Sequence, residues 1–272
     1  MSPSSLEPER FNVFGVGVSA IEMSQALDVI EGWIQQHKPH YVCVTGVHGI
    51  MESYRNGDMQ RIHNAAGLVT PDGMPMVWLA HRHGYRHVRR VYGPDLMLAL
   101  CECSASASYR HFLYGGAKGV PERLAENLLR RFPKLNIVGT YSPPFVPLSH
   151  EEDEEIVQAI NESNPDIVWV GLGTPKQERW MAAHVNRLTT PVLIGVGAAF
   201  DFHSGEKSQA PRLMQQSGLE WLFRLLCEPR RLWRRYLVNN SQFIMLILLQ
   251  RLGLSYHMKV RSTRTRSPRK AG

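Results

Sequence analysis

The 272-residue sequence lacks an apolar run long enough to cross a membrane. Its longest such run, residues 243–249, has seven residues, whereas a membrane-spanning helix needs roughly 20. The first ten residues are polar and include two glutamates, unlike a secretory signal. These absences predict a soluble, intracellular protein.

Cysteine is also scarce. The four cysteines are Cys43, Cys101, Cys103 and Cys227. Their positions show no paired spacing of the kind that binds zinc, and four scattered thiols fit a reducing cytosol better than a disulfide framework. We therefore expect neither a structural metal site nor disulfide bonds.

Three fingerprints of nucleotide chemistry are missing. The chain has no Walker P-loop, no G-x-G-x-x-G directly after the first predicted strand, and no D-x-D pair to hold a divalent ion on a nucleotide sugar. These absences argue against an NTPase and a standard dehydrogenase. The acidic run at 151–155 lies at a predicted helix start, where carboxylates interact favourably with the helix dipole, so it does not need a catalytic role.

An excess of positive charge is absent from most of the chain, although the net charge is +7. From residue 225 to the end there are eleven Lys or Arg residues against one Glu, whereas residues 1–224 carry 20 basic and 23 acidic residues. The C-terminal segment therefore holds the whole excess. We expect this segment, and not the main fold, to meet an anionic surface.

Short apolar segments alternate with amphipathic helical patterns over most of the sequence, and 43% of the residues are hydrophobic. Strands are expected at 11–18, 40–45, 67–70, 111–114, 135–138, 166–171 and 192–196. Ser19 and Ser149, each followed three positions later by Glu, predict capping boxes at two helix starts. Near-continuous apolar strands between helices are typical of a parallel sheet covered on both faces. The sequence thus predicts a doubly wound α/β fold with one mostly parallel sheet.

The pattern becomes helical after Pro211, with one helix expected at 213–227 and a new one starting at Pro229. Residues 259–272 are low in complexity and rich in arginine, which predicts disorder. We therefore divide the chain into a flexible N-terminus (1–10), an α/β domain (11–210), a helical, basic and amphipathic appendage (211–258) and a disordered basic tail (259–272).

Small or polar residues follow four of the predicted strands, at 45–48, 70–73, 115–118 and 171–178. In a doubly wound sheet, ligands bind beyond the carboxyl ends of the strands. Helix N-termini and bare backbone N–H groups there suit phosphate oxygens. Tight packing between helix and strand also requires glycine, so the glycines alone do not decide between a binding and a packing role.

Asp72 stands out among these residues because it lies between Pro71 and Gly73 directly after a short strand. It could be a turn or helix-capping aspartate. It could also be a general base that takes a proton from an attacking hydroxyl. The segment 89–95 follows about 20 residues later and offers a guanidinium for a diphosphate.

Residues 11–236 resemble the WecG/TagA/CpsF family of bacterial glycosyltransferases. The resemblance rests on the order and spacing of several motifs. They are Pro71-Asp72-Gly73-Met74, Arg90-Val91-Tyr92-Gly93-Pro94-Asp95-Leu96, Tyr114-Gly115-Gly116, the run from Gly171 to Glu178, the run from Gly195 to Asp201 with Ser204-Gly205, Ala210-Pro211, the run from Gly218 to Leu225, Glu228-Pro229 and Arg231.

The resemblance implies that a sugar is transferred from a UDP-sugar to an undecaprenyl-diphosphate-linked acceptor, with inversion to a β-linkage and with neither a metal nor another cofactor. Members of the family transfer N-acetylmannosamine, N-acetylmannosaminuronic acid or glucose while building surface polysaccharides. The 11–210 domain would then be catalytic. An arginine could supply the electrostatic stabilisation that a metal gives elsewhere.

The resemblance also implies roles for particular residues. Asp72 would be the general base on the acceptor hydroxyl. The substrate and nucleotide site would draw on Thr45, His48, Arg90, Asp95, Tyr114, Gly115, Gly116, Gly173, Pro175, Lys176, Gln177, Glu178 and Asp201. The chain has Val47 where many family members have Asn, which affects the choice of sugar; His48 either compensates or is an ordinary helix N-terminal histidine.

In the same family a C-terminal appendage docks on the membrane and closes over the active site. Its basic positions correspond to Arg224, Arg231 and Arg234, with Arg235 beside them. Arginines among aromatic and aliphatic residues suit the headgroups of an anionic leaflet. The alternative is a helix packed on the body with a solvated basic face. The resemblance places the protein in the cytoplasm, bound peripherally to the inner face of the cell membrane, and leaves a homo-oligomer open.

The sequence leaves three other functions to consider. A glucosyltransferase of an exopolysaccharide repeat unit would differ in its donor sugar. A nucleic-acid-binding module would use the basic tail, but it leaves Asp72, Arg90 and Gln177 without a role, and the body is not basic. A nicotinamide-dependent enzyme is disfavoured because the chain lacks the dinucleotide-binding fingerprint. We expect no nucleic-acid partner.

Overall fold

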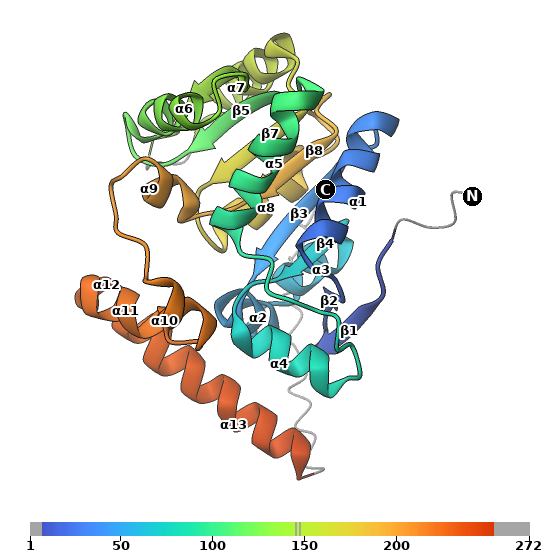
Figure 1. Ribbon diagram of the computed structural model, residues 1–272, viewed down its shortest axis with the longest axis vertical. Coiled ribbons are helices and arrows are strands. Elements are labelled where there is room, and N and C mark those ends of the chain that lie inside the picture. Colours follow the sequence, from blue (N-terminus) through green and yellow to red (C-terminus); the bar gives the residue numbers. More distant parts are fainter. Residues whose placement is uncertain (1–6, 145, 147, 253–272) are drawn as a thin grey trace, which may run out of the picture.

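The centre of the protein is a six-stranded sheet of order β4-β3-β8-β7-β5-β6, in which every neighbouring pair is parallel (Figure 1). The fold is seen in a computed structural model that describes residues 7–144, 146 and 148–252. The strands are β3 (His40–Thr45), β4 (Leu68–Pro71), β5 (Arg110–Gly115), β6 (Asn136–Tyr141), β7 (Ile167–Gly171) and β8 (Val192–Gly195). The predicted parallel sheet is confirmed.

Helices cover both faces of this sheet, as predicted. They are α1 (Met23–Gln36), α2 (Val47–Arg55), α3 (Gly57–Ala65), α4 (Met74–Arg82), α5 (Gly93–Ala107), α6 (Val120–Arg131), α7 (His150–Ser163), α8 (Lys176–His184) and α9 (Ala199–His203). Alternate residues of the central strands enter two separate hydrophobic cores. On β7, for example, Val168 and Val170 face a core shared with α2, α4, α7 and α8, whereas Trp169 faces one shared with α1, α5 and α6.

The N-terminal segment differs from the single strand expected at 11–18. It forms an antiparallel hairpin of β1 (Arg10–Val13) and β2 (Val16–Ser19), separate from the main sheet. Phe14 and Gly15 both have positive φ and turn the chain between the two strands. The apolar alternation runs through this turn without a break, which is why the prediction of one strand, and of one sheet only, was wrong.

One predicted capping box is wrong and the other is confirmed. Ser19 lies in β2, where its Oγ accepts a hydrogen bond from the Val69 N–H at 3.1 Å, and α1 is capped instead by Glu22 with Gln25. Ser149 caps α7, and its side chain and that of Glu152 satisfy each other's backbone N–H groups.

The C-terminal segment is helical, but the helix expected at 213–227 is interrupted. It consists of α10 (Arg212–Gln216) and α11 (Glu220–Cys227), separated at Gly218, which has a φ of +77°. After α12 (Pro229–Trp233), the π-helical turn η1 (Arg234–Val238) leads into α13 (Asn239–Arg251). We call residues 211–252 the appendage. The predicted disordered tail, 259–272, lies outside the described residues.

Helix α13 lies along the lower half of the body in Figure 1 and packs on α2. Phe243 and Leu246 are buried in the same core as α2 and α4, and Phe243 meets the ring of Phe14 edge-on. The appendage is therefore anchored to the α/β domain by its own apolar residues. None of the helices among the described residues is both long and apolar enough to cross a membrane.

Candidate active site

A cavity of about 720 Å³ opens at the carboxyl edge of the sheet, between the ends of β3 and β4, helices α2 and α4, and the appendage. The charged and polar residues that line it come from both parts of the chain. They are His48, Asp72, Arg82, Arg90, Thr174, Gln215, Ser217, Glu220, Arg224, Arg235, Asn240 and Arg251. The appendage thus forms one wall of the cavity.

Asp72 follows β4 directly, and its backbone N–H donates to the Thr45 carbonyl at 3.1 Å, so the carboxylate is fixed at the strand end. Its Oδ1 lies 3.5 Å from the guanidinium of Arg90, while 29% of its side chain remains exposed to the cavity. This Oδ1 is itself buried and accepts no hydrogen bond from the described residues.

Arg90 is held by more than Asp72. It forms an ion pair with Glu220 of α11 and lies over the ring of Tyr92, with its central carbon 3.8 Å from the ring centroid. The hydroxyl of Tyr92 donates to the same Glu220 carboxylate at 2.8 Å. Asp72, Arg90, Tyr92 and Glu220 therefore form one connected cluster that joins the domain to the appendage.

The pKa values in this cluster follow from burial and charge. Burial raises the pKa of Asp72 above its usual value, and the nearby Arg90 only partly offsets this effect. Burial would lower the pKa of Arg90, but the carboxylates of Asp72 and Glu220 outweigh it and raise that pKa. A carboxylate whose pKa is raised binds a proton more readily than an ordinary aspartate, which suits it to act as a general base.

Two arginines of the appendage reach the same cavity, Arg224 from α11 and Arg235 from η1. Neither forms an ion pair among the described residues, and the Nε of Arg235 is buried without a hydrogen-bond partner. Burial, together with Arg224 and Arg231 nearby, lowers the pKa of Arg235. Two guanidiniums without carboxylate partners form a site that suits a diphosphate.

His48 links three segments at the edge of the cavity. Its Nδ1 accepts a hydrogen bond from the amide of Asn239 at 2.9 Å, and Thr174 lines the cavity beside it. Arg55 donates to the other end of the Asn239 amide at 2.8 Å. Burial, reinforced by the charge of Arg235, lowers the pKa of His48 to about 3, so the ring is neutral and holds α13 through hydrogen bonds.

Thr45 is buried beneath the cavity and is not among its lining residues. Its Oγ1 lies 3.1 Å from Nε2 of His63, whose Nδ1 lies 3.0 Å from the hydroxyl of Ser53. The structure therefore places Thr45 in a buried polar chain under the floor of the site.

The glycines after β5 have a packing role. A Cβ added to Gly115 would lie 2.6 Å from the backbone of Gly171, so the close approach of β5 and β7 requires glycine there. The N–H of Gly116 donates to the Gly171 carbonyl at 3.0 Å. Tyr114 is buried, with its ring stacked 4.2 Å from that of Trp180. These residues lie outside the cavity lining.

The loop between β7 and α8 is shaped by its own polar side chains. Gln177 accepts a hydrogen bond from the Gly173 N–H at 3.1 Å, and Glu178 accepts one from the Thr174 hydroxyl at 2.8 Å. Both side chains are buried, and Thr174 is the loop residue that lines the cavity. Pro175 precedes α8, and Lys176 is exposed at its start.

The remaining predicted residues lie away from the cavity. Asp201 is bonded to Lys207 at 2.8 Å, and Lys207 also contacts Glu228, which pairs with Arg231 at 2.6 Å. This chain joins α9 to the appendage. Two further residues are exposed: Asp95 in the first turn of α5, and Arg234 beside the ring of Trp233.

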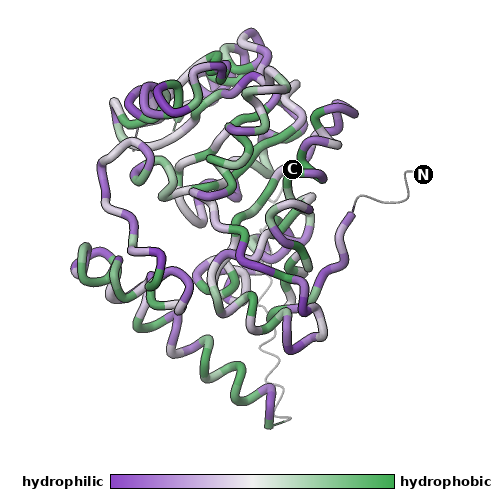
Figure 2. Tube along the Cα trace, in the orientation of Figure 1, coloured by the Kyte–Doolittle hydropathy of each residue, from purple (hydrophilic) through white to green (hydrophobic). Residues whose placement is uncertain are grey.

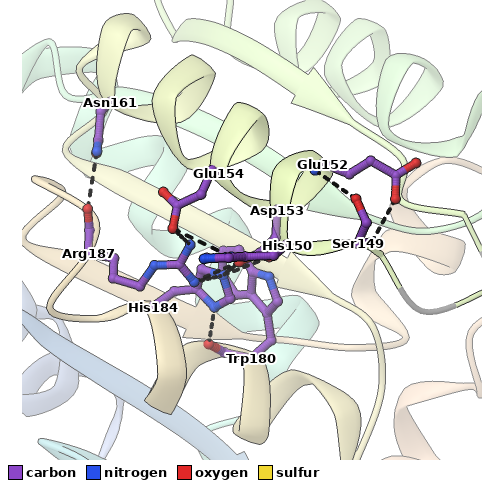
Figure 3. Close-up of polar contacts among 9 residues, drawn as sticks. All are labelled: Ser149, His150, Glu152, Asp153, Glu154, Asn161, Trp180, His184 and Arg187. Atoms are coloured by element: carbon purple, nitrogen blue, oxygen red, sulfur yellow. Dashed lines mark hydrogen bonds and ion pairs between the residues drawn. The ribbon is translucent and has the colours of Figure 1, made fainter.

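The acidic run at the start of α7 is structural, as expected (Figure 3). Asp153 accepts hydrogen bonds from His184 at 3.1 Å and from Arg187 at 2.6 Å, and Glu154 accepts one from Arg187 at 2.8 Å. These bonds tie α7 to the end of α8. In the part of the chain that the structure describes, no group of three or more His, Cys, Asp or Glu side chains is arranged to hold a metal ion.

Sequence reasoning missed three residues of the site: Tyr92, Glu220 and Asn239. Tyr92 and Glu220 do lie inside the motifs that carry the family resemblance, but nothing in the sequence pairs them. Asn239 follows a run of basic and apolar residues that drew attention to charge, not to a single amide.

The sequence is similar to those of several known proteins. Residues 11–256 match the model of the WecG/TagA/CpsF glycosyl transferase family. A Bacillus spizizenii N-acetylglucosaminyldiphosphoundecaprenol N-acetyl-beta-D-mannosaminyltransferase is 31% identical over 205 residues, which cover 75% of this chain and 77% of that protein. A Staphylococcus aureus protein of the same name is 27% identical over 230 residues, 83% of this chain and 87% of that protein. The chain is a glycosyltransferase and belongs to the WecG/TagA/CpsF family.

Proposed function

We propose that this enzyme transfers N-acetylmannosamine from a UDP-sugar to an undecaprenyl-diphosphate-linked N-acetylglucosamine, with inversion at the anomeric carbon. The names of the relatives in Bacillus and Staphylococcus support the acceptor and the sugar. Glucose is the competing donor sugar. The reason is that Val47 lines the cavity with an apolar side chain at a position where many family members have Asn, whose amide could hold a polar group of the sugar. The product would enter a cell-envelope polysaccharide.

The observation that carries the proposal is that the Asp72 carboxylate, with its buried Oδ1, shares one cavity with Arg224 and Arg235, which form no ion pair among the described residues. Asp72 accepts the proton of the acceptor hydroxyl as its oxygen attacks the anomeric carbon. The bond from that carbon to the diphosphate breaks, and UDP leaves with the electron pair. Arg90, which lies 3.5 Å from Asp72, would stabilise the charge that develops on the departing diphosphate. Arg224 and Arg235 would bind the diphosphate of the acceptor.

We also propose that the appendage binds the cytoplasmic face of the membrane. Five of its exposed apolar side chains are Leu226, Leu237, Ile244, Met245 and Leu248. Figure 2 shows hydrophobic stretches along α13, interrupted by polar positions. Arg231 and Arg234 are exposed beside them, and the combination suits an anionic leaflet. A lipid-linked acceptor would have to be met at that surface.

The experiment is release of UDP by the purified enzyme with an undecaprenyl-diphosphate-N-acetylglucosamine analogue and a panel of UDP-sugars, with EDTA present. Turnover with UDP-N-acetylmannosamine supports the proposal, and turnover with UDP-glucose alone replaces its donor. Binding of UDP without turnover on any donor would contradict the proposed acceptor. Inhibition by EDTA would contradict the role given to the arginines.

A further inference from the structure

Part of the cavity lining is apolar and comes from α4 and α13, and we call this part the arm. Its walls are mostly hydrophobic and come from both helices. The residues that the argument uses are Met74, Trp78 and Leu79 of α4 and Phe243, Ile244 and Ile247 of α13. In Figure 1 these helices lie at the lower edge of the molecule, beyond the carboxyl edge of the sheet. The arm thus connects the reacting end of the cavity with the surface of the protein.

The side chains of the arm are apolar and yet partly open to solvent. Trp78 is 55% exposed and Ile244 is 58% exposed, although both line the cavity. The ring of Trp78 lies against Gly218, where an added Cβ would be 3.2 Å from Cη2. The turn between α10 and α11 therefore holds this indole as a wall of the arm. Contiguous apolar surface left exposed in this way is typical of a binding site.

Charge changes in a fixed order along the cavity. Asp72 precedes α4 and Arg235 precedes α13, so both lie near the helix ends opposite Arg82 and Arg251, and Arg224 lines the same cavity. The apolar arm comes next. Arg82 and Arg251, the last residues of α4 and α13, are exposed and line the outer end. A ligand that matches this order has a hydroxyl to deprotonate, then a diphosphate, then an apolar chain that leaves between two cations.

A UDP-sugar does not match that order because it is polar along its whole length. The acceptor proposed above does match, since its sugar is joined by a diphosphate to a long isoprenoid. We propose that the arm between α4 and α13 binds the isoprene units nearest the diphosphate of this acceptor, while the rest of the chain continues into the membrane. The nine residues of α4 span about 12 Å of helix axis, so only the first units are enclosed.

This inference rests on the proposed function and explains the apolar lining contributed by α4, which membrane docking leaves unused. A chain held by the arm would fix the diphosphate against Arg224 and Arg235 and so align the acceptor sugar with Asp72. Trp78 and Ile247 then determine specificity for a lipid-linked acceptor. They act on binding of the chain and do not touch the reacting atoms.

The test uses two acceptors in solution without vesicles: a diphosphate-linked N-acetylglucosamine carrying two isoprene units, and the same compound carrying a methyl group. The ratio of their kcat/KM values measures how much the chain contributes. The arm predicts that the parent enzyme prefers the prenyl compound by about tenfold or more, and that Trp78→Ala and Ile247→Ser lose most of this preference. Trp78→Phe should keep it, because an aromatic wall remains.

Trp233→Ala is the matched control. Trp233 is a similarly exposed tryptophan of the appendage, at 49%, but it does not line the cavity. The variant should keep the prenyl preference of the parent. If both tryptophan variants lose vesicle binding and neither changes the ratio in solution, the arm is part of the membrane-facing surface and the inference is wrong.

A binding measurement separates this inference from the proposed function. Farnesyl diphosphate should bind the parent at least about tenfold more tightly than inorganic diphosphate, and Trp78→Ala should abolish the difference. If these binding differences are found but no sugar is transferred to either acceptor, the assignment of the arm as a prenyl-binding site is supported and the proposed function is contradicted. If transfer occurs without any prenyl preference in rate or binding, the proposed function stands and the arm is refuted.

Discussion

Glu220 of α11 forms an ion pair with Arg90, a residue 130 positions earlier that lies just before α5. The carboxylate also accepts a hydrogen bond from the Tyr92 hydroxyl. Since Arg90 is in turn 3.5 Å from Asp72, closure of the appendage and the electrostatics of the base are coupled through one guanidinium. An appendage that moved away would leave Arg90 with Asp72 as its nearest anion.

Glu220→Gln should therefore lower turnover by about tenfold, because a charge-assisted bond worth some 1.5–3 kcal/mol is weakened. Amide exchange in α11 and α13 should increase at the same time. Glu206→Gln is the matched control, since Glu206 forms an exposed ion pair with Arg123 away from the cavity. Equal effects of the two variants would show that the Glu220 contact does not hold the appendage closed.

Asp72 should lower the stability of the folded enzyme at neutral pH. Its pKa is raised in the folded state, so the folded protein holds this proton more readily than the unfolded chain. Stability then falls as the pH rises from the ordinary aspartate pKa through the raised one. Asp72→Asn should increase Tm at pH 8, and the increase should shrink as the pH is lowered toward 4.

The effect of Asp153 on stability should have the opposite sign to that of Asp72. Hydrogen bonds from Arg187 and His184 outweigh its partial burial and lower its pKa. Its contribution to stability is present above the ordinary aspartate pKa and is lost as the pH falls through the lowered value. Asp153→Asn should therefore decrease Tm at pH 8. A decrease of Tm in Asp72→Asn as well would contradict the account of its environment.

Arg235→Gln should lower kcat/KM for the lipid-linked acceptor by about tenfold or more, because a charge-assisted bond to the acceptor diphosphate, worth about 1.5–3 kcal/mol, is lost. The variant also removes a buried cation whose pKa is already lowered by burial, so its Tm should not fall. Arg230→Gln, an exposed change on α12, is the control. A loss of Tm that matches the loss of activity would indicate a structural role for Arg235.

The sequence alone predicts the sheet well, because buried parallel strands leave near-continuous apolar runs such as 167–171. It fails at the Phe14–Gly15 turn, where the apolar pattern continues through a reversal of the chain. It also places a single helix across Gly218, since spacing of leucines does not reveal a positive φ. These are local conformations that hydrophobic periodicity does not encode.

The site is predictable only in part. Asp72 and Arg90 lie in motifs beside strand ends, and the topology brings those ends to one edge. The hydrogen bond between Glu220 and Tyr92 joins residues 128 positions apart and depends on how the appendage packs on the domain. No local sequence pattern predicts such a contact. The same holds for Asn239 and His48, which meet across 191 positions.

The central claim is that Asp72 is the general base, and the most direct test is single-turnover sugar transfer by Asp72→Asn. UDP affinity is measured in parallel on the same preparation. The account predicts a rate about 10²–10⁴-fold below that of the parent, the range typical of a lost general base, with UDP affinity unchanged. A parent-like rate would contradict the account.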